Sequence, residues 1–203
     1  MTRRRSPGPH RGQAMPGRVR IVAGKWRGRL LPVGDEPELR PTAERIRETL
    51  FNWLAPRIEG ARCLDLFAGT GVLGLEALSR GATEVVFVER SRPAAVALQR
   101  SIATLSAERA IVHVGDAFAW LVNNEPKPKD IVFLDPPYAL ESLTELCRLL
   151  HAKSWLARDA CIYMEQDRDD ERPILPDDYT VEREKTAGSV RYCLVRAPLN
   201  GEE

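Results

Sequence analysis

Two short stretches of the sequence combine residue types at spacings that could do chemistry. The first, DLFAGTGVLGLEAL, places Gly69, Gly71 and Gly74 in the spacing G-x-G-x-x-G. Such glycines let a strand turn tightly into a helix beside an adenosine-bearing ligand, so they fit a nicotinamide dinucleotide and other cofactors alike. The second, DPPY at residues 135–138, directly follows an apolar run. The acids around the first stretch decide which cofactor it suits.

Acidic residues stand where three predicted strands end. Asp65 lies four residues before Gly69, where a carboxylate would repel the pyrophosphate of a dinucleotide but attract the sulfonium and ammonium groups of S-adenosyl-L-methionine. Glu89 is placed to accept both ribose hydroxyls, a role open to either cofactor. Asp116 could accept a hydrogen bond from the adenine amino group. We expect the cofactor to be held by Asp65, Phe67, Gly69, Gly71, Glu89, Asp116, Ala117 and Asp135.

The DPPY segment predicts methyl transfer to an exocyclic amine. Such an amine is a poor nucleophile because its lone pair is delocalised. The Asp135 carboxylate and the Pro136 carbonyl can each accept one N–H, which aims the lone pair at the sulfonium methyl, while the diproline stiffens the bend. Tyr138 offers a ring on which an extruded base can stack. These three are the expected catalytic residues; the simpler alternative is a strand stop followed by a turn.

The elements that must position these residues follow one rhythm from residue 62 onward. Short apolar strands are predicted at 62–67, 84–89, 110–116, 130–135 and 160–166, and helices at 72–80, 92–105, 117–122 and 142–151. This alternation indicates a parallel, doubly wound α/β sheet with ligands at the carboxyl ends of its strands. Two further strands meet at Gly188 with no helix between them, so an antiparallel hairpin should end the sheet.

These features together predict the fold class. It is a Rossmann-like class I S-adenosylmethionine-dependent methyltransferase fold with a small N-terminal β-hairpin and helix extension, rather than a dehydrogenase domain, which usually continues with another parallel unit. We expect a disordered basic tail at 1–17, an N-terminal hairpin and helix at 18–56, and the methyltransferase domain at 57–203.

Charge is distributed unevenly along the chain. Residues 1–34 carry nine basic and no acidic side chains, whereas the rest carry 21 basic and 29 acidic ones, so +9 faces −8. A basic arm on an acidic body points to a polyanionic partner, because phosphate contacts release counterions. For residues 1–17 alone, a solvated tail is an equally good interpretation.

Composition disfavours membrane, secreted and metal-binding proteins. No run approaches the ~20 apolar residues of a membrane helix, and the N-terminus has no apolar core typical of a signal peptide. The four cysteines are widely spaced and the histidines are isolated, so we expect reduced core thiols and no metal. We expect a cytoplasmic monomer.

The chain also resembles a known family, the RsmD-type bacterial 16S ribosomal RNA guanine-N2 methyltransferases. The likeness runs from about residue 18 to 197, through RIVAGKWRGRLLPV, LRPTAERIRETLFNWLAP, CLDLFAGTGVLGLEALSRGA, DIVFLDPPY and REKTAG. It implies methylation of one guanine N2 in 16S ribosomal RNA, on an assembling small-subunit particle.

The resemblance also implies roles for the N-terminal region. Arg20, Lys25, Arg27 and Arg29 should grip RNA phosphates. Trp26 either stacks on a base or packs in the core. Arg40, Thr42 and Arg45 look like a segment that closes over the cofactor or the target base, while Ile46, Leu50, Phe51 and Trp53 are expected in the core.

Two rival functions stay open on the sequence alone. One is a related amino-methyltransferase acting on DNA adenine or on a protein glutamine; the basic hairpin disfavours the protein substrate but does not separate DNA from RNA. The other is a non-catalytic RNA-binding assembly factor, against which the intact Asp135 and glycine loop count.

Overall fold

The computed structural model describes residues 17–32, 44–137 and 140–197. The expected site residues Arg40, Thr42 and Tyr138 lie outside these ranges, as does most of the basic tail. The helices are α1 (Glu44–Leu54), α2 (Val72–Ser79), α3 (Arg92–Leu105), α4 (Ala117–Asn123) and α5 (Leu140–Ala152). The strands are β1 (Arg18–Arg20), β2 (Leu30–Pro32), β3 (Arg62–Asp65), β4 (Glu84–Glu89), β5 (Ala110–Val114), β6 (Lys129–Leu134), β7 (Leu156–Asp167), β8 (Thr180–Ala187) and β9 (Val190–Arg196).

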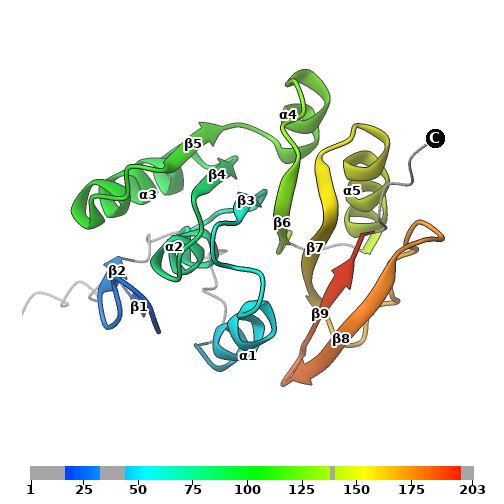
Figure 1. Ribbon diagram of the computed structural model, residues 1–203, viewed down its shortest axis with the longest axis horizontal. Coiled ribbons are helices and arrows are strands. Elements are labelled where there is room, and N and C mark those ends of the chain that lie inside the picture. Colours follow the sequence, from blue (N-terminus) through cyan, green and yellow to red (C-terminus); the bar gives the residue numbers. More distant parts are fainter. Residues whose placement is uncertain (1–16, 33–43, 138–139, 198–203) are drawn as a thin grey trace, which may run out of the picture.

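The main sheet has seven strands in the order β5-β4-β3-β6-β7-β9-β8 (Figure 1). Strands β5, β4, β3, β6 and β7 are parallel, and β9 pairs antiparallel with both β7 and β8. The predicted mostly parallel sheet with a terminal antiparallel hairpin is therefore confirmed. The order reverses between β3 and β6, which is where α/β sheets bind ligands outside the carboxyl ends of their strands.

Two hydrophobic clusters cover the two faces of the sheet. Side chains alternate along each strand, so Cys63 and Phe133 enter one cluster while Leu64 and Val132 enter the other. The first cluster also receives apolar residues from the N-terminal hairpin, α1, α2 and α3, and the second receives those of α4 and α5. Both faces of the central strands are covered, which explains their nearly continuous apolar sequences.

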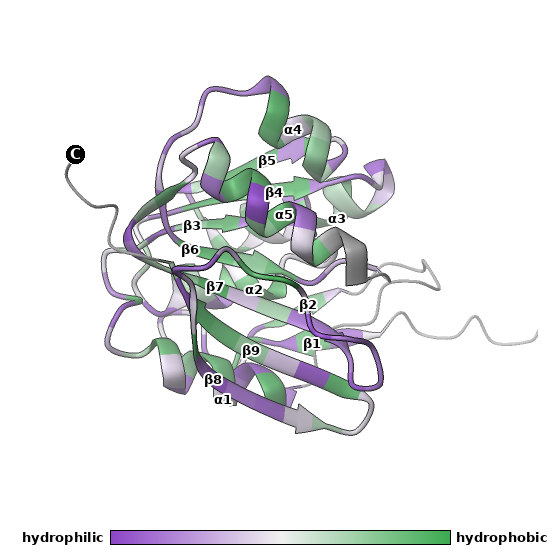
Figure 2. Cartoon of the chain, turned by 90° about the vertical axis from the view of Figure 1, so that its right-hand side faces the viewer, coloured by the Kyte–Doolittle hydropathy of each residue, from purple (hydrophilic) through white to green (hydrophobic). Residues whose placement is uncertain are grey.

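The last two strands differ in character from the centre of the sheet. Strand β8 lies at the edge and is mostly hydrophilic, whereas the central strands are mostly hydrophobic (Figure 2). The turn between β8 and β9 uses Gly188 at φ 62°. Arg57, just after α1, forms an ion pair of 2.7 Å with Glu182 of β8. Polar side chains on an exposed edge discourage pairing with other chains.

Strand β7 begins earlier than the sequence indicated. It starts at Leu156 rather than at residue 160, because Leu156 pairs with Lys129 before a register shift leads to the pair of Ile131 with Cys161. The irregular pairing conceals the first residues of the strand from a periodicity analysis.

The N-terminal hairpin shares a core with the main domain. Strands β1 and β2 pair antiparallel, as predicted, with Val19 opposite Leu31. Both side chains are buried in the cluster that contains α1 and the sheet. The hairpin and α1 therefore pack against the sheet through one shared hydrophobic cluster.

Two further structural findings bear on the composition. None of the helices in the described part of the chain is long and apolar enough to cross a bilayer. The four cysteines are free thiols, and Cys63, Cys147 and Cys161 are buried, in keeping with core positions.

Candidate active site

Strand register brings acids from three neighbouring strands to one edge of the sheet. Asp65 at the end of β3 pairs with Phe87 of β4 on one side and with Phe133 of β6 on the other. Glu89 and Asp135 each lie two residues beyond those partners, so all three acids belong to the same face of the sheet. Burial raises the pKa of the Asp65 carboxyl, and the charges of Asp135 and Glu89 both act on it and raise its pKa further. The sequence-predicted acids are therefore brought together.

A fourth acid, which the sequence analysis missed, extends this group. Tyr163 of β7 pairs with Phe133, and Glu165 follows two residues later on the same face. Glu165 is 7% exposed, and its Oε1 accepts a hydrogen bond of 2.6 Å from the Tyr163 hydroxyl. An acid inside the apolar stretch CIYMEQ was the available signal. We call Asp65, Glu89, Asp135 and Glu165 the acidic edge.

The glycine loop between β3 and α2 has the conformation that its sequence predicted. Gly69 and Gly71 have φ of 51° and 74°, values that favour glycine. Gly71 is the N-cap of α2, and a Cβ there would lie 2.2 Å from Leu98 of α3. The loop therefore brings bare backbone to the edge of the sheet, where a cofactor can approach closely.

Glu89 fixes the shape of this loop. Its Oε2 accepts the Gly69 N–H at 2.7 Å, and its Oε1 accepts the Ser91 N–H at 2.6 Å. Each carboxylate oxygen has two lone pairs, so each can accept one further hydrogen bond, for example from a ribose hydroxyl. The bidentate role expected for Glu89 fits this geometry.

Asp65 is a buried carboxyl group with an altered acidity. It is 3% exposed, and its Oδ2 accepts a long hydrogen bond of 3.3 Å from the Gly74 N–H. Burial raises its pKa to about 7, and Asp135 and Glu89 add to the rise. A cation beside this group would favour the ionised form.

Asp116 and Ala117, which follow β5 and are expected to bind the cofactor, also have structural roles. Asp116 is the exposed N-cap of α4, and its Oδ1 accepts the Ala119 N–H at 3.0 Å. Ala117 is buried and Phe67 half-buried against the cluster of α4 and α5. Asp116 follows Gly115, whose N–H donates to the Glu89 carbonyl at 2.9 Å, so the two acids stand at neighbouring strand ends.

Asp135 and Pro136 follow the end of β6 directly. Strand β6 ends at Leu134, and both residues are half-buried, so the bend is partly open to a substrate.

The basic hairpin is fastened to the far end of the helix that begins at the glycine loop. The buried Glu76 of α2 accepts the backbone N–H groups of Val22 and Ala23 at 2.7 and 2.9 Å. The Ser79 carbonyl accepts the Lys25 N–H at 2.7 Å, and the Ser79 hydroxyl accepts the Trp26 N–H at 2.9 Å. The glycine loop and the hairpin are thus attached at opposite ends of α2.

Gly24 makes this close docking possible. It has φ of 80°, and a Cβ at this position would lie 1.8 Å from the Ser79 carbonyl oxygen. Only glycine fits, for conformational and steric reasons together.

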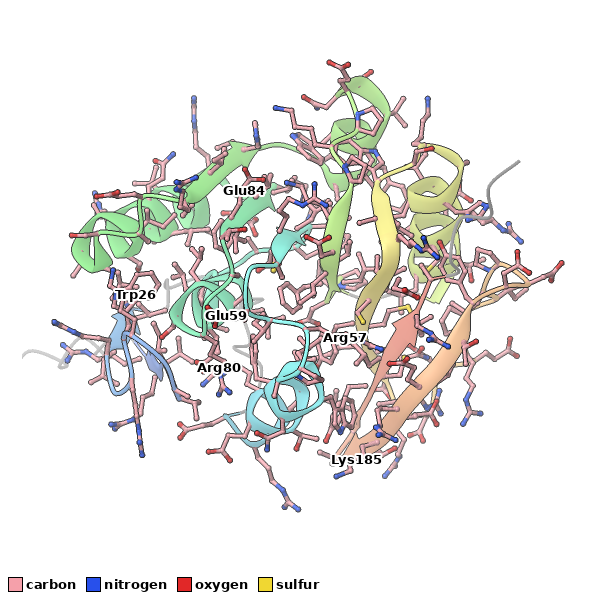
Figure 3. All side chains as sticks on the ribbon, viewed as in Figure 1. Trp26, Arg57, Glu59, Arg80, Glu84 and Lys185 are labelled. Atoms are coloured by element: carbon pink, nitrogen blue, oxygen red, sulfur yellow. The ribbon has the colours of Figure 1, made fainter. Side chains whose placement is uncertain are left out.

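The structure separates the expected RNA-binding residues into two kinds. Trp26 is 8% exposed and belongs to the core, on the side of the hairpin that faces α3 (Figure 3). Of its two possible roles, core packing therefore fits, and base stacking does not. Of the expected basic residues, Arg20, Lys25, Arg27, Arg29 and, on α1, Arg45 are exposed.

A buried arginine links the hairpin to the acidic edge and was also missed from the sequence. Arg47 of α1 is fully buried, and its Nη2 donates to the Arg20 carbonyl at 2.7 Å. Its Nε and Nη1 have no hydrogen-bond partner among the described residues. Burial lowers the pKa of Arg47, while the charges of Glu76 and Glu165 oppose the change.

Comparison with known proteins gives consistent relationships. Residues 19–196 match the family model described as Conserved hypothetical protein 95. The chain is 47% identical over 186 residues to the Ribosomal RNA small subunit methyltransferase D of Escherichia coli, covering 92% of this chain and 93% of that protein. It is 35% identical over 173 residues to a Bacillus subtilis protein named Putative rRNA methyltransferase YlbH, covering 84% and 94%.

A solved structure agrees with this relationship. The chain matches the Escherichia coli putative methyltransferase yhhF with a TM-score of 0.83 and 44% identity, covering 90% of this chain and 99% of that one. The structure of SMU.776, a putative methyltransferase complexed with SAH, matches with a TM-score of 0.66 at 14% identity and supports the fold alone. The chain therefore belongs to the family of the ribosomal RNA small subunit methyltransferases D.

Proposed function

We propose that this protein is an S-adenosylmethionine-dependent methyltransferase that methylates N2 of one guanine in 16S ribosomal RNA. The observation that carries the proposal is the position of Asp135 and Pro136 at the end of β6, beside Asp65 and Glu89, in a chain of this family. Relatives named as ribosomal RNA methyltransferases, over nearly their full lengths, support the RNA substrate.

The residues at the acidic edge fit the cofactor. The glycine loop would receive its amino acid portion, Glu89 its ribose hydroxyls, and Asp116 the adenine amino group. Asp65 would face the sulfonium and ammonium groups of the cofactor and attract them. The same carboxylate would repel the pyrophosphate of a dinucleotide. When bound, S-adenosylmethionine supplies an electrophilic methyl group on a positively charged sulfur.

The chain's own residues would prepare the nitrogen for attack. The Asp135 carboxylate and the Pro136 carbonyl each accept one N–H of the guanine 2-amino group, which orients its lone pair toward the methyl carbon. The bound cofactor would supply the methyl group to N2 and would leave as a neutral thioether. The Asp135 carboxylate, which already accepts an N–H of the amine, would take the proton that the methylated nitrogen releases. Orientation and charge complementarity supply most of the rate enhancement.

The surface arginines and Lys25 of the hairpin would grip phosphates around the target. They project from a loop that Glu76 and Ser79 hold against α2, so their positions relative to the cofactor loop are fixed. Arg45, exposed near the start of α1, would add a further basic side chain for phosphate contacts. We propose a small-subunit particle as the substrate and a monomer as the working unit, in the cytoplasm.

The deciding experiment is to map modified nucleotides in 16S ribosomal RNA from cells with and without this protein. We expect loss of one N2-methylguanine, with restoration by the wild-type gene. Restoration should fail with Asp135→Ala and succeed in part with Asp135→Asn, because an amide oxygen still accepts one N–H. Each purified variant should retain cofactor affinity, measured by calorimetry. An unchanged set of RNA methylations, or a lost methylation on adenine, would contradict the proposal.

A further inference from the structure

We propose that Glu165 recognises the N1–H of the target guanine and thereby selects guanine over adenine. This inference rests on the proposed function and deepens it by assigning a residue to base selection. It concerns a side chain beside the transfer site rather than one of the residues of the DPPY segment.

The position of Glu165 follows from the strand register. Strands β6 and β7 run parallel, with Phe133 opposite Tyr163 and Leu134 opposite Met164. Asp135 and Glu165 come next on their strands and share one face. The charges of both Asp135 and Glu165 act on Tyr163, whose hydroxyl donates to Glu165, so all three groups are close at the edge of the sheet.

Guanine and adenine differ at the position next to the amine, and Glu165 could distinguish them there. In guanine the 2-amino group stands next to N1–H, which is another donor. In adenine the 6-amino group stands next to N1, which is an acceptor. A site that holds the amine with Asp135 and the Pro136 carbonyl needs a neighbouring acceptor for guanine and a neighbouring donor for adenine. Glu165, once ionised, offers only acceptors.

The surroundings of Glu165 orient its carboxyl group. The Tyr163 hydroxyl donates to its Oε1 at 2.6 Å, which fixes the side chain from its own strand. The buried guanidinium of Arg47 on α1 interacts electrostatically with it and so adds a positive charge to its surroundings. A carboxylate can accept about four hydrogen bonds, so N1–H can be accepted alongside the groups that Glu165 already contacts, the Tyr163 hydroxyl among them.

Burial makes this contact selective. Glu165 is only 7% exposed, so a purine presenting an acceptor at N1 would place two acceptors against each other with little water to separate them. A site built to hydrogen-bond one group rejects analogues that lack it far more strongly than an apolar pocket does. The arrangement therefore disfavours the rival reaction on adenine.

The test compares guanine with 2-aminopurine at the target position. The analogue keeps the 2-amino group, presents an acceptor at N1 and lacks the 6-oxo group, so the preference of the wild-type protein is compared with that of a Glu165 variant. Reconstituted small subunits would carry 16S ribosomal RNA ligated with either base at the position mapped in vivo, and single-turnover rates would be measured. For the wild-type protein we expect a preference for guanine of about 100-fold or more. Equal rates on the two bases would overturn the inference.

The variant Glu165→Gln reverses the preference in part, because its amide can donate to the N1 acceptor. We expect the rate on guanine to fall and the rate on 2-aminopurine to rise, so that their ratio drops at least ~10-fold. A fall in both rates by the same factor would indicate a merely structural residue and would refute the assignment. Should this variant fail to fold, Glu165→Ala takes its place, and the preference for guanine should fall there as well.

Tyr163→Phe provides the matched control. It removes the hydroxyl that orients Glu165 but retains the carboxylate, so guanine should still be preferred at a reduced rate. Loss of that preference would contradict Glu165 as the source of selection. Failure of the proposed function would look different, because the wild-type protein would then methylate neither substrate.

Discussion

The buried carboxyl group of Asp65 predicts that cofactor affinity depends on pH. Burial raises its pKa to about 7, so near neutrality a large fraction of the free protein carries this group protonated. Only the ionised form attracts the sulfonium and ammonium groups of the cofactor. Affinity should therefore increase as the pH rises through 7 and level off above 8.

The size of the effect follows from the ionised fraction. With a pKa of about 7, roughly one carboxyl in eleven is ionised at pH 6 and roughly nine in ten at pH 8. The dissociation constant at pH 6 should thus be about tenfold larger than at pH 8, provided that the cofactor holds the group ionised in the complex.

Isothermal titration calorimetry with Asp65→Asn as the control would measure this dependence. Asparagine keeps an acceptor for the Gly74 N–H but does not titrate, so it should bind more weakly at pH 8 and lose the tenfold difference. The amino group of the cofactor titrates near 8 but does so equally with both proteins. An equally steep pH dependence in Asp65→Asn would refute the reasoning.

The same group should affect folding in the opposite sense. The folded-state pKa lies above the usual value of 3.8, so ionisation destabilises the free protein. The penalty is absent below pH 4, develops as the pH rises to 7, and is complete above it. Because a tenfold change in acidity corresponds to about 1.4 kcal/mol, Asp65→Asn should raise the free energy of unfolding at pH 8 by at most about 4 kcal/mol. Urea unfolding at pH 4 and pH 8 would measure it, and equal effects at both would argue against a buried titrating carboxyl.

Three other changes test the attachment and use of the hairpin. Gly24→Ala should reduce both thermal stability and RNA affinity, because its Cβ would meet the Ser79 carbonyl at 1.8 Å. The control is Gly28→Ala, which is also at positive φ but has open space around it and should lose less stability. An equal loss of stability in the two variants would contradict the clash. Glu76→Gln should lower the free energy of unfolding by about 2 kcal/mol in urea titrations, because one amide oxygen cannot replace the acceptors for Val22, Ala23 and Arg80; an unchanged value would contradict that anchoring role. Replacing Arg20, Lys25, Arg27 and Arg29 by Gln should reduce the slope of log affinity against log salt by about 3. The control replaces four exposed basic residues elsewhere, namely Arg158, Arg168, Arg172 and Lys185. An equal reduction of the slope in the control would reject the hairpin as the specific RNA-binding surface.

The sequence predicted the fold because its determinants are local. The alternating and helical patterns of apolar residues lie within single segments, and Gly69 and Gly71 predict the tight turn of the glycine loop. The end of the sheet was equally accessible, since two strands without an intervening helix must pair antiparallel. The start of β7 was misplaced because its first residues pair irregularly with Lys129, which no pattern within β7 reveals.

The missed site residues are those whose roles depend on distant partners. Glu76 binds backbone groups more than 50 positions away, so within its own helix it is simply an acid in an apolar sequence. Glu165 became recognisable only when the register set it beside Asp135. The position of Trp26 was undecidable for the same reason, since an indole between basic residues suits an RNA surface until the helix that covers it is known.

Helix α2 connects these local and distant features into one argument about function. Its first turn receives the glycine loop, and its last turn holds the basic hairpin through Ser79. These hydrogen bonds couple the position of the hairpin to that of the glycine loop. In the proposed function, phosphates bound by its arginines would therefore set the distance from the RNA backbone to the transferred methyl group. Loosening the hairpin without altering its charge, as in Gly24→Ala, should therefore lower the rate of transfer at saturating RNA as well as the affinity, whereas removing its charges should lower mainly the affinity.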